Sequence, residues 1–162
     1  MISIDKNNKV LNDNDMELLQ KKCDNFISSQ TPTLDKDNIN FYFREYMDLK
    51  DPLMHNIVMG LESYIKTKLY TNLELKSMWI NKIDINSNKD DNFHKDISPC
   101  SLILYLNDDY GMGETLFFNK HGKIIGEVKP EKGKIVCFDG SIFHSIKWIP
   151  KGRRIVFVST FI

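Results

Sequence analysis

The sequence lacks the features that would assign it to a membrane or to a disulfide-bonded class. It has no run of about 18 apolar residues, and its start, MISIDKNNKV, has no apolar core of a secretory signal. Its three cysteines, Cys23, Cys100 and Cys137, are far apart and form no Cys-x-x-Cys pair. We therefore expect reduced, mostly buried thiols, without a disulfide framework or a cysteine zinc site, in a cytoplasmic protein.

An excess of basic residues is also missing. Lysine plus arginine and aspartate plus glutamate each total 22, so the formal net charge is zero. Such a chain lacks the positive excess that binders of the phosphate backbone need, which disfavours nucleic acid as a partner. Arginine is scarce: only three of the 22 basic residues are arginines, and two of these are adjacent at Arg153 and Arg154.

What is present is the composition of an ordinary globular domain. Apolar residues make up 41% and charged residues 27% of the 162 positions, which excludes intrinsic disorder of the whole chain. The length fits one domain. We expect a single domain over residues 1–162, with a helical support region at 1–76 and a β-rich core at 77–162.

The first part of the chain carries two helical patterns. Apolar residues recur at helical spacing over residues 15–30, after residues 13–14, which can cap a helix. A second pattern begins at Pro52, a good first-turn residue, and continues to Leu69. Between these two patterns, residues 39–43 have the composition of a short strand.

From about residue 76 the chain changes to short runs rich in β-branched and aromatic residues, each ended by Gly, Asn, Asp or Pro. This is typical of an antiparallel sheet, and eight short strands suit a jelly roll or small barrel. The predicted fold class is mainly β with N-terminal helices on the outer face of one sheet, and the polar stretch 86–92 is expected to be a mobile loop. The expected strands are residues 77–85, 93–96, 100–107, 114–119, 123–128, 134–138, 142–148 and 154–161.

Three side chains in the β-rich part have the ligand types of a mononuclear metal site. His94 and Asp96 are two residues apart, so in an extended segment both side chains point to the same side. His144 lies on a later predicted strand. Two histidines and one carboxylate are the ligands of non-haem Fe(II) oxygenases, which leave coordination positions open. The alternative reading is a surface His-x-Asp pair and an unrelated core histidine.

An arginine follows the second histidine. Arg154 comes after His144 across a turn that contains Pro150 and Gly152. Its guanidinium is permanently charged and can hold a carboxylate with two parallel hydrogen bonds, which lysine cannot reproduce. Alternation along the last strand puts Arg154 on the face with the smaller side chains and Arg153 on the bulkier, aromatic face, so we expect Arg154 inside the barrel and Arg153 outside.

Further motifs accompany these residues in a fixed order across residues 77–162. They are His94-x-Asp96, the strand 101–107 (SLILYLN), the segment 113–118 (GETLFF), the strand 130–138 (PEKGKIVCF), His144-Ser145-Ile146 and Gly152-x-Arg154. In this order and spacing they resemble the Fe(II)- and 2-oxoglutarate-dependent dioxygenase superfamily, and within it the prolyl 4-hydroxylase-like branch. Residues 1–76 add little to the resemblance.

The resemblance implies a double-stranded β-helix (jelly roll, cupin-like) in which His94, Asp96 and His144 hold Fe(II). It also implies that Arg154 binds the distal carboxylate of 2-oxoglutarate and that the hydroxyl of Tyr105 assists, although a purely structural Tyr105 is an alternative. Many collagen-type relatives have lysine at the position of Arg154 and other branches have arginine, so this departure indicates a subfamily.

The implied activity is that of a dioxygenase that uses Fe(II), 2-oxoglutarate and O2, with ascorbate as a candidate reductant. Oxidative decarboxylation of 2-oxoglutarate to succinate and CO2 would be coupled to hydroxylation of a peptidyl side chain, prolyl among the options, or of a free amino acid. Asp96 favours hydroxylation over halogenation, because related halogenases leave that coordination position free for chloride. The expected partners are 2-oxoglutarate and a peptide or small-molecule substrate.

Two other functions stay open at this point. Nucleic-acid demethylases of the same superfamily typically have a second arginine six residues after the first, where this chain has Thr160. A non-catalytic double-stranded β-helix that binds or supports without a metal is the other alternative. The three retained ligand types and the arginine argue against it.

Four more residues have weaker signals. Trp79 and Asn81 lie on the first barrel strand, where relatives sometimes contact substrate, but a core tryptophan and a strand-edge asparagine explain them equally well. His55 falls in a helical pattern and His121 in a turn, so neither is expected to be a metal ligand.

Overall fold

The computed structural model describes residues 1–5, 10–29, 39–42, 51–69, 72–84 and 93–162. The polar stretch 86–92 lies outside them. Within the described residues the chain forms two helices and nine strands: β1 (Ile2–Asp5), α1 (Asp13–Ser29), β2 (Ile39–Tyr42), α2 (Pro52–Leu69), β3 (Leu75–Asp84), β4 (Cys100–Tyr105), β5 (Thr115–Phe118), β6 (Ile124–Val128), β7 (Ile135–Phe138), β8 (Phe143–Ile146) and β9 (Arg153–Phe161).

Both predicted helices are present, and side chains just before them hold their first turns. Asn12, one position before the predicted caps, accepts a hydrogen bond of 2.9 Å from the Asp15 amide at α1. Asp51 accepts one of 2.9 Å from the Leu53 amide at α2, and it also pairs with Lys22 of α1. Neither described helix is long and apolar enough to cross a membrane.

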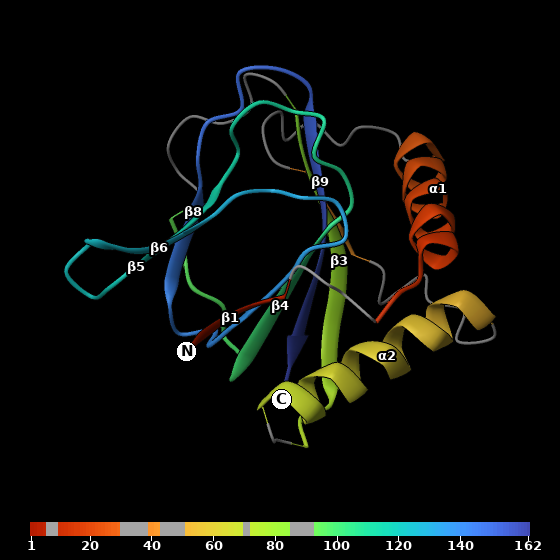
Figure 1. The fold of residues 1–162 in the computed structure, drawn as a ribbon, viewed down its shortest axis with the longest axis horizontal. Coiled ribbons are helices and arrows are strands. Elements are labelled where there is room, and N and C mark those ends of the chain that lie inside the picture. The colour runs from red at the N-terminus through yellow and green to blue at the C-terminus, as the bar shows by residue number, and fades with distance from the viewer. Residues whose placement is uncertain (6–9, 30–38, 43–50, 70–71, 85–92) are drawn as a thin grey trace.

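The strands form two antiparallel sheets. The larger has the order β1-β7-β4-β9-β3-β2, and the smaller has the order β6-β5-β8. The predicted jelly roll, a double-stranded β-helix, is therefore confirmed. Figure 1 shows both helices on one side of the larger sheet and the smaller sheet on the other.

Two strand predictions need correction. Residues 93–96 form no strand but only a single bridge from His94 to His144. The chain bends directly afterwards, at residues 97–99, which leaves no room for a longer ladder. The strand β1 was not predicted; it pairs with β7, with Ile2 opposite Phe138. The other strands agree with the sequence prediction to within two residues at every end.

Each face of the larger sheet buries its own apolar cluster. Alternate residues of β3, β4, β7 and β9 pack against the helices, and the residues between them point into the space between the sheets. The helix-side cluster includes Met16, Leu19, Met54, Ile57, Leu61, Ile80, Leu102, Leu104, Ile155 and Phe157. The cluster between the sheets is Ile103, Tyr105, Phe117, Val128, Val136, Phe138, Val156 and Val158.

Candidate metal centre and buried arginine

The structure brings His94, Asp96 and His144 together. One possible ligand atom from each lies within 4.8 Å of the others. Two backbone hydrogen bonds between the histidines, 3.0 Å from the His94 amide and 2.8 Å from the His144 amide, fix one segment against the other. The Asp96 amide donates to the Gly140 carbonyl at 2.9 Å, so the carboxylate is held by the chain that leads into β8.

Neighbouring groups orient two of these side chains. Ser101 Oγ donates to Asp96 Oδ2 at 2.5 Å, and the other carboxylate oxygen, Oδ1, lies 4.0 Å from His94 Nε2. His144 Nδ1 lies 3.1 Å from the Ile142 carbonyl. Because a carbonyl only accepts, Nδ1 carries the proton, and Nε2 keeps its lone pair for a metal.

The cluster is buried on one side and open on the other. His144 is buried, with its ring centroid 4.8 Å from that of Phe138, and this burial lowers its pKa, which favours the neutral imidazole that binds metals. The side chain of His94 is 54% exposed. A ligand can therefore reach the cluster from the side of His94.

A buried guanidinium lies deeper between the sheets. Arg154 is only 1% exposed, whereas Arg153 is exposed, so the expected strand phase is confirmed. Arg154 Nη1 donates to Asn81 Oδ1 at 3.3 Å and Nη2 to Thr115 Oγ1 at 3.2 Å. Its Nε is buried and has no hydrogen-bond partner within the part of the chain that the structure describes. Among the described residues, no carboxylate lies within ion-pairing distance of Arg154.

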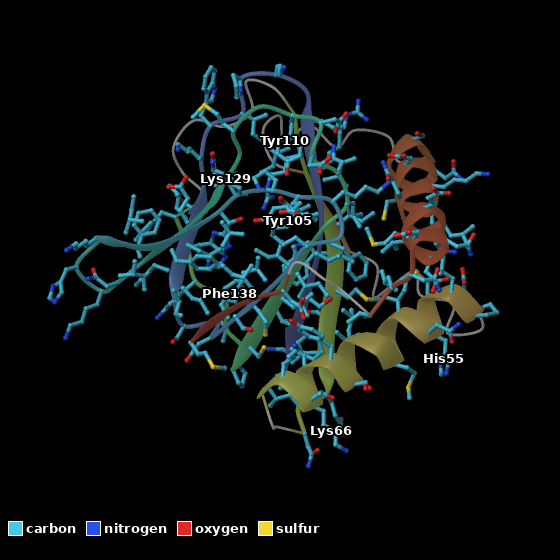
Figure 2. All side chains as sticks on the ribbon, in the orientation of Figure 1. His55, Lys66, Tyr105, Tyr110, Lys129 and Phe138 are labelled. Atoms are coloured by element: carbon cyan, nitrogen blue, oxygen red, sulfur yellow. The ribbon has the colours of Figure 1, made fainter. Side chains whose placement is uncertain are left out.

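Tyr105 shares the threonine with this arginine. Its hydroxyl lies 2.5 Å from Thr115 Oγ1, and the Arg154 Cζ lies 5.3 Å from the centroid of the tyrosine ring. Tyr105 is fully buried between the sheets, and Figure 2 labels it in the middle of the molecule. The hydroxyl of Tyr110 is likewise buried and has no hydrogen-bond partner among the described residues.

The strand register gives the position of Arg154 relative to the cluster of His94, Asp96 and His144. Phe117 of β5 lies opposite His144 of β8, and Thr115 lies opposite Ile146. Thr115 is therefore two residues along β5 from the level of His144, about 6.6 Å at 3.3 Å per residue. Arg154 contacts Thr115, so the guanidinium lies beside a strand position two residues from the level of His144.

Sequence reasoning missed two residues that contact Arg154. Thr115 stood inside a family-like segment without an assigned role, and Asn81 was explained equally well as a strand-edge residue. Asn81 is buried and bonds Arg154. It lies two residues after Trp79 on β3, so both share the face between the sheets, and this pattern could have suggested its role. As expected, His55 and His121 are exposed and lie outside the cluster; Figure 2 labels His55 on α2.

No protein-family model matches the chain. A curated relative, prolyl 3-hydroxylase 2 of Homo sapiens, is 35% identical over 57 residues, which cover 33% of this chain. The chain spans only 8% of the length of that protein. This sequence match is therefore local.

The solved structures match the whole fold. An oxidoreductase of the 2OG-Fe(II) oxygenase family from Burkholderia pseudomallei has a TM-score of 0.71 at 10% identity, covering 99% of this chain and 83% of its own. The viral collagen prolyl hydroxylase of Paramecium Bursaria Chlorella virus-1, in its 2OG complex, has 0.67 at 15%, covering 99% and 94%. A prolyl hydroxylase of Trichoplax adhaerens, with a hypoxia inducible factor peptide fragment, has 0.63 at 13%, covering 99% and 83%. This chain therefore has the double-stranded β-helix fold of the 2OG-Fe(II) oxygenase superfamily.

Proposed function

We propose that this chain is an Fe(II)- and 2-oxoglutarate-dependent dioxygenase that hydroxylates a peptidyl or free amino-acid side chain. The observation that carries the proposal is the buried guanidinium of Arg154, whose hydrogen-bond partners among the described residues are the neutral Asn81 and Thr115. A buried charge without a counter-charge is costly. An anionic ligand would remove that cost, and a dicarboxylate would also reach the metal cluster.

The three clustered side chains fit Fe(II). Two imidazoles and one carboxylate are its typical ligands in oxygenases, and they leave positions open for other ligands. In this role His94, Asp96 and His144 would hold the ion. Once bound, Fe(II) and 2-oxoglutarate supply the O2 chemistry that converts a C–H group into a hydroxyl.

The remaining residues would bind and orient the cofactor. The guanidinium of Arg154 can bind the distal carboxylate of 2-oxoglutarate with two parallel hydrogen bonds. Its contacts with Asn81 and Thr115 fix the orientation of the guanidinium. Thr115 in turn positions the Tyr105 hydroxyl at the same end of the pocket. Phe117 and Phe138, which are buried beside His144, exclude water from the inner side of the cluster.

The substrate class is supported by the names of the similar proteins. Prolyl hydroxylases are among them, and one was solved with a peptide fragment, so we favour a peptidyl, and first of all a prolyl, substrate. The demethylase alternative is disfavoured further by Thr160, where those enzymes typically have an arginine. Its Oγ1 lies 2.6 Å from Ser77 Oγ, which is a structural role.

The test has a binding step and a turnover step. Anaerobic addition of Fe(II) and then 2-oxoglutarate should give a visible charge-transfer band, and the His94→Ala variant should not show it. With O2 and ascorbate, lysate peptides and metabolites should gain the mass of one oxygen atom as succinate forms. If wild-type protein binds neither Fe(II) nor 2-oxoglutarate, the non-catalytic alternative is correct; an oxidised methyl group lost from nucleic acid would indicate a demethylase.

A further inference from the structure

Two of the three cysteines lie next to each other beneath the helices. Cys100 is the first residue of β4 and Cys137 lies in β7, which pairs with β4. Their Sγ atoms are 3.1 Å apart. Both side chains are almost fully buried, and all three cysteines are free thiols in the structure.

The register explains why the two sulfurs meet. Cys137 lies directly opposite Leu102, so Cys100, two residues earlier on β4, is its diagonal neighbour on the same face. A disulfide needs its sulfurs about 2.05 Å apart. The thiols therefore need to approach by about 1 Å, with both strands already paired.

We propose that Cys100 and Cys137 are a redox pair that forms a reversible disulfide with hydrogen peroxide. The Cys100 thiolate attacks the peroxide O–O bond, which gives a sulfenic acid and, after protonation, one water. The Cys137 thiol then attacks the sulfenic sulfur, which forms the S–S bond and releases a second water. Two thiols are oxidised and one peroxide is reduced to two waters.

Two local features favour Cys100 as the first thiol to react. It follows directly on the bend at residues 97–99, in which Ile97 is 90% exposed, so local opening at this strand end gives a small oxidant access. Its hydrogen bond with Cys137 lowers the Cys100 pKa, and the thiolate is the reactive form. Burial raises the pKa of Cys23 on α1, which makes that thiol a natural control.

Each of the two cysteines is followed in sequence by a residue that contacts the candidate metal centre. The next residues along the two strands, Ser101 and Phe138, lie opposite each other. Ser101 bonds Asp96, and Phe138 packs on His144. A disulfide would tie together the two strands that support these ligands, but its formation does not depend on the proposed dioxygenase activity.

The test uses the 162-residue chain, free of metal, treated with hydrogen peroxide. Oxidation should lower the intact mass by two hydrogen atoms. Under denaturing conditions, N-ethylmaleimide should label three cysteines before oxidation and only Cys23 afterwards, and dithiothreitol should restore the original pattern. A non-reducing peptide map should show the Cys100–Cys137 crosslink.

Single variants decide the roles within the pair. The Cys23→Ser variant should still lose two hydrogen atoms, whereas Cys137→Ser should stop at a Cys100 sulfenic acid that dimedone traps. Circular dichroism of each reduced variant confirms that it folds. The inference is overturned if oxidised wild-type protein still takes three maleimides, or if the crosslink includes Cys23 or a second chain.

Discussion

Ser101 lies directly opposite Phe138 in the β4–β7 pair, and each of them supports a different residue of the metal cluster. The Ser101 hydroxyl donates to Asp96 at 2.5 Å, and the Phe138 ring packs edge-on against His144 with centroids 4.8 Å apart. One cross-strand pair of the larger sheet therefore supports two side chains of the candidate metal centre, which come from two distant segments.

Replacing Ser101 by alanine should weaken metal binding without removing a ligand. Loss of a hydrogen bond to a metal-binding carboxylate typically costs about 10- to 100-fold in affinity. Anaerobic calorimetry with Fe(II) measures the change, and Ser141→Ala, at an exposed serine that bonds Asp139, is the matched control. Equal affinities of the Ser101 and Ser141 variants would show that this hydroxyl does not orient the carboxylate.

The two adjacent arginines should behave differently towards 2-oxoglutarate. We expect Arg154→Ala to raise the KM by about 10- to 100-fold, because a charge-assisted hydrogen bond contributes about 1.5–3 kcal/mol. Arg154→Lys keeps the charge but loses the fork and should be intermediate. Arg153→Ala, which changes an exposed side chain, should stay close to wild type; the reverse order would place the cofactor elsewhere.

Gly140 should tolerate no side chain. An added Cβ would lie 2.3 Å from the Ser98 carbonyl oxygen, and the Gly140 carbonyl accepts the Asp96 amide. We expect Gly140→Ala to cost about 1–3 kcal/mol in the free energy of unfolding, as overpacked sites do, and to weaken Fe(II) binding. Gly126→Ala, where the nearest atom is 3.5 Å away, is the control. Urea unfolding compares them, and similar midpoints would contradict the expectation.

Stability at acid pH should depend on Asp51. The hydrogen bond from Lys22 lowers the pKa of its carboxyl below the ordinary value of 3.8. A lowered folded-state pKa means that the stabilisation is complete above the unfolded-state pKa and is lost as pH falls through the folded one. Asp51→Asn keeps a capping oxygen but removes the charge, so its stability deficit at neutral pH should disappear in acid. A deficit that persists unchanged below pH 3 would exclude this explanation.

Local patterns were sufficient to predict most of the fold. The helices followed from apolar spacing and from Pro52, and the inward position of Arg154 followed from alternation along one strand. The strand β1 was not predictable in this way, because four residues carry little signal and their pairing partner, β7, is far away in the sequence. Of residues 93–96, only His94 forms a bridge, so the predicted strand there was wrong.

The residues that support the site were harder to predict from local patterns, because their roles depend on tertiary contacts. Thr115 and Asn81 are short polar side chains that fit many positions in a sheet. Their contact with Arg154 becomes visible only when β3, β5 and β9 are placed in space. The three clustered side chains were predictable because their residue types and order are distinctive.

Thr115 provides the sharpest test of the proposed carboxylate site, because its hydroxyl contacts both Tyr105 and Arg154. Thr115→Val keeps the shape of the side chain but leaves two buried groups without this partner, at a cost of about 1–3 kcal/mol for an unsatisfied group. The free energy of unfolding should fall, and the KM for 2-oxoglutarate should rise because the fork is no longer fixed. Tyr105→Phe removes only one of the two contacts, so its effect on the KM should be smaller. If saturating 2-oxoglutarate does not raise the unfolding midpoint of wild type more than that of Thr115→Val, the cofactor carboxylate does not depend on this threonine.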